Sequence, residues 1–293
     1  MTTLIEARGL RKSYGKAVAL AGIDLRIEAG RIVGLIGPNG AGKTTALKAI
    51  LGLTAYDGEL TVMGLNPHED RHRLMQEVCF IADVAVLPRW LRVNQAVDFV
   101  AAIHPRFNRE RADSFLAKTD IKPRSRVREL SKGMVTQLHL ALIMAIDAKL
   151  LVLDEPTLGL DIIYRKKFYE TLLNDYFDGN RTILITTHQV EEIQQVLTDV
   201  VFIDHGRIAL NCSMDEVETR FAEVMVNPDK LDAARALHPL HERQVFGRGV
   251  FLFENVDRAT LSRLGEIHTP SIADLFVAKL SGQGASDKSK VAA

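Results

Sequence analysis

Residues 31–45 read RIVGLIGPNGAGKTT, and this stretch decides the fold class. Its first part, 31–36, is a short apolar run of the kind that forms a strand buried on both faces. Its second part, 37–44, has the spacing G-x-x-x-x-G-K-T, and a helical pattern follows over 46–51. Gly52 is placed to end that helix. A strand, a glycine-rich turn and a helix in this order predict a phosphate-binding loop.

The residues of this turn have distinct expected roles. Its glycines let successive backbone N–H groups face the phosphates, and the N-terminus of the next helix adds a positive dipole. Lys43 is expected to reach the β- and γ-phosphates, and the Thr44 hydroxyl to bind magnesium. An ordinary glycine-rich turn is the alternative, which the flanking strand and helix disfavour. The expected nucleotide-binding residues here are Gly37, Pro38, Asn39, Gly40, Ala41, Gly42, Lys43, Thr44 and Thr45.

A second motif, LLVLDEPT at 150–157, supplies two adjacent carboxylates. Four apolar residues carry Asp154 and Glu155 to the C-terminal end of a strand, where open α/β sheets bind ligands. Asp154 is expected to hold magnesium, and Glu155 to orient and polarise the attacking water. The alternative, two acids that close a strand at the surface, is common for an isolated Asp–Glu pair.

The apolar runs at 182–187 and 200–203 resemble the run before the two carboxylates. Helical stretches separate these runs, which predicts a mainly parallel α/β sheet. The alternation at Ile23, Leu25 and Ile27 predicts a half-buried antiparallel strand.

The order of these motifs resembles the nucleotide-binding subunit of an ATP-binding cassette (ABC) transporter, over about residues 4–211. LSKGM, at 130–134, resembles the signature sequence of that family. The resemblance implies a P-loop NTPase cassette with a mainly parallel core sheet, an antiparallel β subdomain and a helical lobe. It also implies ATP and Mg²⁺ as ligands, ATP hydrolysis, and a head-to-tail dimer around two ATP molecules. In that dimer Ser131 and Gly133 of one subunit face the phosphate loop of the other.

Three further positions match the family. Tyr14 corresponds to the aromatic residue that stacks on adenine, and Val18 is expected to line the same face. Asp161 matches the residue that communicates across the dimer. His188 matches the histidine that contacts the γ-phosphate and the attacking water. A lone tyrosine or histidine is more often structural, so these assignments depend on the whole set. The expected catalytic residues are Glu155, His188 and Lys43.

The sequence departs from the family at three positions. The family usually has a glutamine after the strand at 78–82, and the aligned residue here is Asp83. Its carboxylate can face magnesium, so Asp83 is a third expected metal ligand, but it cannot donate a hydrogen bond as an amide can. Lys132 replaces a common glycine in the signature, and Gln137 stands where arginine is frequent. Hydrolysis is expected to persist.

The chain is expected to contain two domains and a tail. Residues 1–212 form the predicted nucleotide-binding domain, with a helical lobe over about 89–145. Residues 213–281 form a predicted small C-terminal α+β domain, and 282–293 a flexible tail. The terminal helix expected at 271–280 resembles one found after the cassette in many export-type subunits.

Composition sets limits on compartment and partners. The 293 residues include 37 lysines and arginines against 37 acidic residues, which gives no net field toward nucleic acid. Cys79 and Cys212 show neither a disulfide framework nor a zinc spacing. The N-terminus does not resemble a signal peptide, and no apolar run reaches the ~18 residues of a membrane helix. A cytoplasmic subunit, peripheral on the inner face of the membrane, is expected.

One motif matches a different class of protein, the zinc proteases. HEDRH, at 68–72, satisfies the HExxH pattern of zinc proteases. That pattern needs a buried helix and a third ligand, whereas Pro67 and several charges surround this stretch. A solvated surface segment is the preferred interpretation.

Two functions are compatible with these motifs. The first is the ATPase subunit of a transporter, with a lean toward export, a second copy of the chain as dimer partner, separate permease subunits, and no nucleic acid. The second is a soluble ABC-type ATPase in a non-transport process, such as translation or DNA maintenance. Soluble relatives usually carry two cassettes or a long coiled coil. The single phosphate loop and the balanced charge favour the first.

Overall fold

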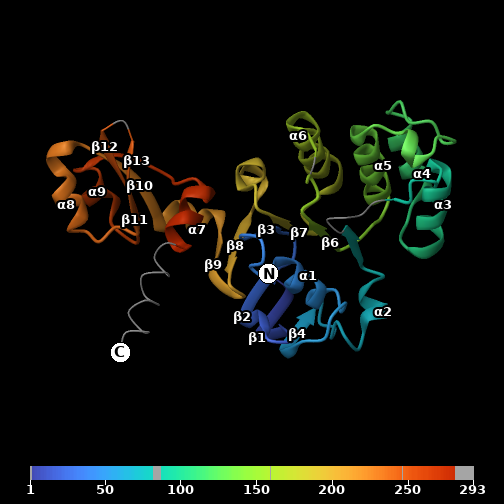
Figure 1. Cartoon of the computed structure of the whole chain (residues 1–293), viewed down its shortest axis with the longest axis horizontal. Helices are drawn as coiled ribbons and strands as arrows, with labels where there is room; N and C mark the ends of the chain where they lie inside the picture. Colours follow the sequence, from blue (N-terminus) through green and yellow to red (C-terminus); the bar gives the residue numbers. More distant parts are fainter. Residues whose placement is uncertain (1, 82–86, 159, 246, 281–293) are drawn as a thin grey trace.

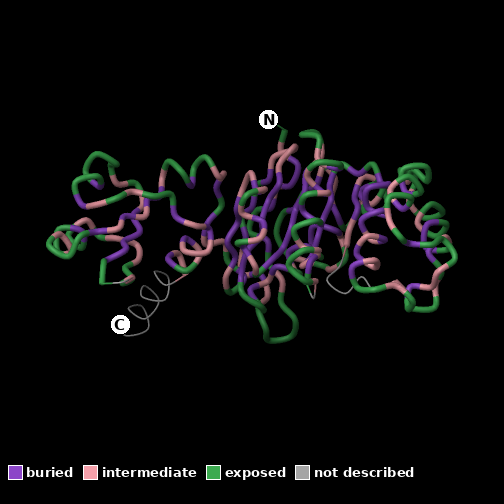
Figure 2. Tube along the Cα trace, turned by 90° about the horizontal axis from the view of Figure 1, so that it is seen from above, coloured by how far each residue is buried: buried purple, intermediate pink, exposed green. Residues whose placement is uncertain are grey.

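The computed structural model describes residues 2–81, 87–158, 160–245 and 247–280, and its strands form three sheets. The central sheet lies between a small C-terminal sheet at one end of the molecule and a helical lobe at the other (Figure 1). Buried residues concentrate in the central part of the molecule (Figure 2). The predicted tail at 282–293 lies outside the described residues.

The central sheet has six strands in the order β5-β6-β7-β3-β8-β9. Neighbouring strands run parallel, except for β8 and β9, which are antiparallel. The predicted mainly parallel core sheet is therefore confirmed. The strands are β3 (Ile32–Ile36), β5 (Val78–Ile81), β6 (Leu150–Asp154), β7 (Thr182–Thr187), β8 (Asp199–Asp204) and β9 (Arg207–Ser213).

Both faces of this sheet are covered, which explains why its strands are continuous apolar runs. In β3, Val33 and Leu35 belong to one hydrophobic cluster, whereas Ile32 and Ile36 belong to a second cluster. Successive side chains of a strand point to opposite faces, so each strand supplies both clusters.

A separate antiparallel sheet, in the order β2-β1-β4, covers one of these faces. Its strands are β1 (Thr3–Tyr14), β2 (Ala17–Glu28) and β4 (Asp57–Val62). Ile23, Leu25 and Ile27 alternate along β2 and are buried in one cluster with Leu47 of α1 (Lys43–Ile50). The half-buried antiparallel strand is confirmed.

Glycine ends α1 for a steric reason. Gly52 follows the last residues of the helix with a φ of +64°, a left-handed conformation. A Cβ atom at this position would lie 2.0 Å from the carbonyl oxygen of Pro67. Only glycine fits here without movement of the backbone.

Three helices build the lobe, within the expected residues 89–145. They share a hydrophobic core that includes Val93, Val97, Leu116, Leu138 and Leu142. The elements around the sheet that complete this half of the chain are α2 (Arg71–Leu74), α3 (Val93–Ile103), α4 (Arg109–Leu116), α5 (Lys132–Met144) and α6 (Ile162–Thr171). No helix among the described residues is both long and apolar enough to cross a membrane.

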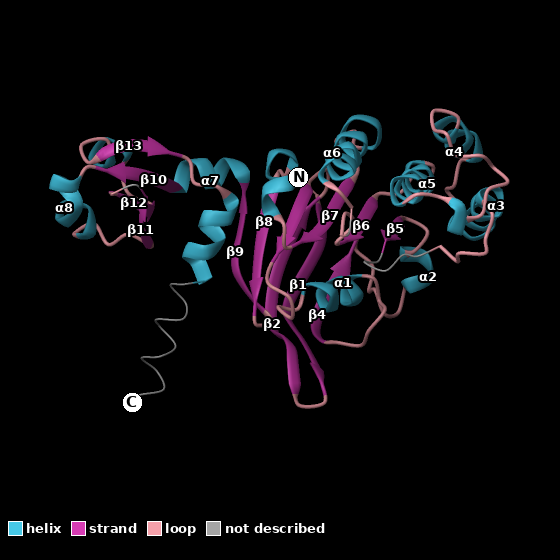
Figure 3. Ribbon diagram, turned by 45° about the horizontal axis from the view of Figure 1, so that its top comes forward, coloured by secondary structure: helices cyan, strands magenta, loops and turns pink. Residues whose placement is uncertain are grey.

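The C-terminal sheet has the order β11-β12-β10-β13 and its own hydrophobic core. Val224, Phe251, Phe253 and Leu261 are buried in that core. All three sheets and their helices appear together in Figure 3. The elements are α7 (Met214–Arg220), β10 (Phe221–Val226), α8 (Leu231–Arg235), β11 (His241–Val245), β12 (Arg248–Glu254), α9 (Arg258–Leu261) and β13 (Gly265–His268).

The last described helix, residues 272–280, packs into the core of the central sheet rather than into the core of the C-terminal sheet. Ile272 and Leu275 are fully buried in one cluster with Phe202 of β8. The ring of Phe276 meets the ring of Phe202 edge-on, with 5.1 Å between centroids. A domain boundary at residue 212 therefore stays a prediction, because this helix lies across it.

Ion pairs join the other side of the same helix to the C-terminal sheet. Arg243 of β11 lies 2.9 Å from Asp274, and Lys279 lies 2.8 Å from Glu254 of β12. The helix 272–280 is thus one structural connection between the C-terminal sheet and the central sheet, beside Phe221 and Leu252, which lie in the same central cluster.

Candidate nucleotide-binding site

The glycine-rich loop lies so close to its neighbours that side chains are excluded at two of its positions. Gly42 has a φ of +110°, and a Cβ there would lie 2.5 Å from the carbonyl oxygen of Ala19. A Cβ at Gly37 would lie 2.3 Å from the carbonyl oxygen of Ile203. The loop is therefore held against β2 and β8, and its glycines are needed for that approach.

Lys43 is the first residue of α1 and is almost fully buried. Its Nζ donates to the carbonyl oxygens of Gly37 at 2.7 Å and Pro38 at 3.3 Å. It also lies 3.5 Å from Oε1 of Glu155. The first turn of α1 has no acidic residue. A buried cation beside a helix N-terminus can bind an anion such as a phosphate.

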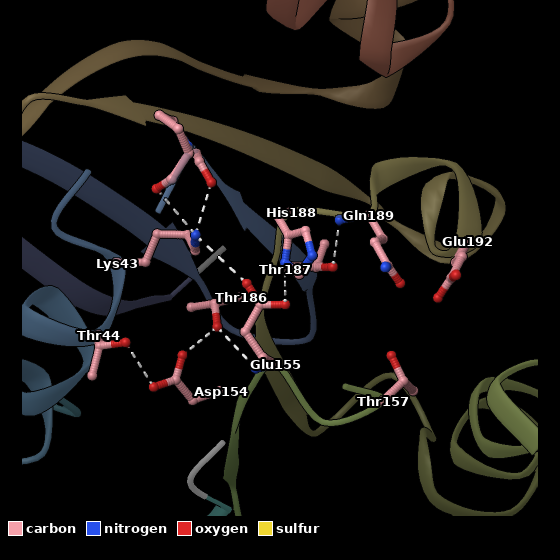
Figure 4. Close-up of polar contacts among 12 residues, drawn as sticks. Lys43, Thr44, Asp154, Glu155, Thr157, Thr186, Thr187, His188, Gln189 and Glu192 are labelled. Atoms are coloured by element: carbon pink, nitrogen blue, oxygen red, sulfur yellow. Dashed lines mark hydrogen bonds and ion pairs between the residues drawn. The ribbon is translucent and has the colours of Figure 1, made fainter. Parts of the chain in front are cut away.

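Asp154, at the end of β6, is buried and meets two hydroxyl groups. Thr44 Oγ1 donates to Oδ2 at 2.9 Å, and Thr186 Oγ1 donates to Oδ1 at 2.5 Å. The fold thus joins the two expected magnesium ligands that lie 110 residues apart in sequence (Figure 4). One carboxylate and one hydroxyl fit Mg²⁺, which takes few protein ligands and completes its shell with phosphate and water oxygens. Asp83 lies outside the described residues.

Glu155 adopts a left-handed backbone conformation, with a φ of +47°. Such a conformation is unfavourable for a residue other than glycine and persists where neighbours fix it. Here the backbone N–H of Glu155 donates to Oγ1 of Thr186 at 3.1 Å. The turned backbone directs the carboxylate toward His188, whose Nδ1 lies 2.9 Å from Oε2. The other oxygen, Oε1, is buried and has no hydrogen bond with any described residue.

Arg165 connects the two loops that flank the carboxylates, and sequence analysis missed it. Its Nε donates to the carbonyl oxygen of Leu160 at 2.6 Å, and its Nη1 lies 2.5 Å from Oε1 of Glu192. Nη1 also donates to the side chain of Gln189. Arg165 lies four residues after Asp161, at helical spacing, and this spacing was the sequence signal that could have placed it beside the Asp161 loop. Thr186 was missed too, although it lies two residues before His188 on a predicted strand.

Ser131, Gly133 and Asp161 are placed at helix N-termini. Ser131 caps α5 by accepting from the N–H of Met134 at 3.2 Å. Asp161 caps α6 by accepting from the N–H of Tyr164 at 3.1 Å. In both Figure 1 and Figure 3 α5 lies in the lobe, away from α1. Ser131 and Gly133 are therefore not brought to the phosphate loop within one chain.

Tyr14 and Val18 lie on the hairpin of β1 and β2, and their side chains are about half exposed. The pKa of Tyr14 is lowered, chiefly by the hydroxyl of Thr54 and further by that of Thr45 in the loop. Lys12 Nζ lies 5.1 Å from the centroid of the Tyr14 ring. Tyr14 thus presents a half-exposed ring, with Lys12 over it, beside the end of the phosphate loop.

The loop with its buried lysine, the Thr44–Asp154 pair and the Glu155–His188 pair define a P-loop nucleotide-binding cassette. The family model described as "ABC transporter" matches residues 20–158. Nod factor export ATP-binding protein I of Cupriavidus pinatubonensis is 32% identical, with 97% of this chain and 92% of that protein covered. Daunorubicin resistance ATP-binding protein DrrA3 of Streptomyces coeruleorubidus is also 32% identical, with 81% and 78% covered.

A solved structure, the ATP-binding subunit of an ABC transporter, has the same fold. Its TM-score is 0.66 at 24% identity, and the match covers 74% of this chain and 92% of that chain. The chain belongs to the ATP-binding proteins of ABC transporters. Proteins of this family bind ATP, are ATPases and work with the other subunits of a transporter, so the chain is an ATPase subunit.

Proposed function

We propose that this chain powers export by an ABC transporter, through a head-to-tail dimer that encloses two ATP molecules with Mg²⁺. The observation that carries the proposal is the Glu155–His188 pair at 2.9 Å, beside Lys43 and the Thr44–Asp154 pair. The export direction is supported by two relatives whose names refer to Nod factor export and daunorubicin resistance.

The residues would divide the work of hydrolysis as follows. The N–H groups of the loop and Lys43 would bind the phosphates and hold them in place. Mg²⁺, held by Thr44 and Asp154, would neutralise charge on the phosphate oxygens. Glu155 would accept a hydrogen bond from the attacking water at Oε1, which has no other such bond, while His188 holds Oε2.

A second copy would supply the signature residues. Ser131 and Gly133 lie in the lobe, so a phosphate at the loop would need these residues from another subunit. Exposed apolar side chains surround the Asp161 loop: Leu158, Ile162 and Ile163 are 52%, 78% and 75% exposed. Adjacent exposed apolar residues are typical of a contact surface. This supports a homodimer that closes over the Asp161 loop.

Separate permease subunits would bind where the lobe meets the central sheet. A cavity of about 420 Å³ lies there, lined mainly by apolar side chains that include Cys79, Phe80, Leu87 and Leu142. Burial lowers the pKa of His139, which also lines the cavity. A neutral, apolar recess fits a short apolar segment of a partner. Such contacts would hold the chain at the inner face of the membrane.

The test is the mass of Glu155→Gln in solution, measured by size exclusion with light scattering, with and without ATP and Mg²⁺. We expect a monomer that becomes a dimer only with ATP, because the variant binds ATP but cannot turn it over. Wild type should hydrolyse ATP. Glu191→Gln, which changes an exposed acid near His188, is the matched control and should keep the wild-type rate. A variant that stays monomeric in saturating ATP would rule out the homodimer.

A further inference from the structure

The helical lobe carries a concentration of arginines that the linear sequence hides. Two segments, 88–93 and 122–129, run antiparallel side by side. Backbone hydrogen bonds join them, from Val127 N–H to the Leu91 carbonyl at 2.9 Å and from Val93 N–H to the Ser125 carbonyl at 3.0 Å. Five arginines therefore share one small area, which we name the arginine surface: Arg89, Arg92, Arg124, Arg126 and Arg128.

The charges of the arginine surface are not neutralised by any carboxylate that the structure describes. Across the described residues, none of its five guanidinium groups forms an ion pair with a carboxylate. Arg92 donates to the backbone carbonyl of Arg124 at 3.1 Å, which joins the two segments. The one acid in the two segments, Glu129, accepts from the backbone N–H of Arg126. Since the whole chain has a formal net charge of zero, this is a local excess of positive charge.

A tryptophan stands among these arginines. Trp90 lies between Arg89 and Arg92 in sequence, and its side chain is 68% exposed. It is the only tryptophan of the chain. An exposed tryptophan flanked by arginines is typical of surfaces that meet the headgroup region of a bilayer, where the indole ring lies at the level of the headgroups.

The guanidinium groups and the single aromatic residue of the arginine surface favour an anionic lipid surface over other acidic partners. Guanidinium groups bind phosphate oxygens in pairs, and several of them close together attract anionic lipids. Single-stranded nucleic acid is bound on rows of stacking aromatics, whereas this surface has one. The segment 88–93 also reaches the cavity proposed for the permease, because Pro88 lines that cavity.

We infer that the arginine surface, together with Trp90, binds the phosphate headgroups of anionic lipids at the membrane. The inference rests on the proposed function only in that it places the chain beside a bilayer. The contact would add a direct lipid attachment to the attachment through permease subunits. ATP hydrolysis does not depend on it.

The test uses Trp90 as its own reporter. Full-length protein is mixed with vesicles of phosphatidylcholine alone or with added phosphatidylglycerol, and flotation and tryptophan emission are recorded. We expect flotation and a blue shift of emission only with phosphatidylglycerol, both weakened by salt. Arg89→Gln/Arg124→Gln/Arg128→Gln should weaken binding by more than about tenfold, because each basic residue adds to the attraction. The control, Arg207→Gln/Arg248→Gln/Arg263→Gln, removes three exposed arginines elsewhere and should bind as wild type does.

Several results would overturn the inference. These are no dependence on phosphatidylglycerol, flotation without a shift of Trp90 emission, or equal weakening in the control variant. A shift produced by polyglutamate but not by vesicles would indicate an acidic protein partner instead. The ATPase rate without vesicles, measured on every variant, separates this result from the proposed function: the rate should be unchanged whether or not lipid binds.

Discussion

Arg165 and Glu192 form an ion pair of 2.5 Å between α6 and the segment that follows His188. The same guanidinium holds the carbonyl of Leu160, next to Asp161, at 2.6 Å. One partly buried side chain therefore links the loop proposed to face a second subunit with the loop that carries His188. A displacement of one loop must be accommodated by the other.

Removing this link should reduce turnover more than ATP binding. In Arg165→Ala we expect kcat to fall about tenfold or more with KM for ATP changed less than about threefold, because His188 loses its fixed position while the phosphate loop keeps its contacts. Arg165→Lys should recover part of the rate. Steady-state ATPase assays measure both constants. Lys166→Ala, at the exposed neighbour, should match wild type, and an equal loss there would contradict the role of Arg165.

Asp154→Asn should abolish the dependence of ATP binding on magnesium. The amide keeps an acceptor for Thr44 or Thr186 but removes the charge that would balance Mg²⁺. We expect wild type to bind ATP more tightly with Mg²⁺ than with EDTA, and the variant to bind equally in both. Titration calorimetry measures this. Asp199→Asn, which alters an acid on β8, is the control. If Asp154→Asn still binds ATP more tightly with Mg²⁺ than with EDTA, Asp154 is excluded as a ligand.

His188→Ala should leave ATP binding intact and reduce hydrolysis by about two to three orders of magnitude, as loss of a positioned catalytic group typically does. The physical reason is the 2.9 Å contact that holds Oε2 of Glu155. His205→Ala is the matched control, since His205 pairs with Asp204 on the surface. A variant with more than about half the wild-type kcat would show that the histidine is structural.

Gly133→Ala should be harmful because of Tyr164. A Cβ at this position would lie 2.2 Å from Cζ of the Tyr164 ring, so either this ring or the start of α5 must move. We expect a loss of about 1–3 kcal/mol in the free energy of unfolding, from urea denaturation. Tyr164→Ala in the same chain should recover much of that loss by making room. If the double variant is no more stable than the summed losses of the two single variants predict, the steric explanation is wrong.

Leu275→Ala should destabilise the whole cassette. Leu275 is fully buried in the central core, and its truncation should cost about 2–5 kcal/mol in the free energy of unfolding. Val277→Ala, at a half-exposed side chain on the same helix, should cost under about 1 kcal/mol. We expect a single cooperative unfolding transition, which shifts as a whole to lower stability in Leu275→Ala. A transition confined to the C-terminal sheet would contradict this packing.

The motif-bearing parts of the site were predictable because local sequence determines them. The strand, glycine turn and helix around Lys43 follow one another in the chain, and Asp154 ends an apolar run whose burial could be inferred. Parallel strands end at one edge of the sheet, so the Thr44–Asp154 pair could be anticipated.

The remaining features depend on contacts across long stretches of chain. Arg165 meets Glu192 only because α6 lies beside the loop after β7. The arginine surface needs two segments some thirty residues apart, and a search for a continuous basic run overlooks it. The terminal helix was expected from its periodicity, but an apolar face does not specify which core it joins. Its contact with Phe202 could not be read from sequence.

The place of that helix has a consequence for how the protein is made. During synthesis the N-terminal part of a chain begins to fold while the rest is still inside the ribosome. Here the face of β8 and β9 that carries Phe202 and Leu210 is completed by Ile272, Leu275 and Ala278. An apolar part of the cassette therefore stays uncovered until some sixty further residues have emerged, and during that interval it is open to chaperones and to misassembly with other nascent chains.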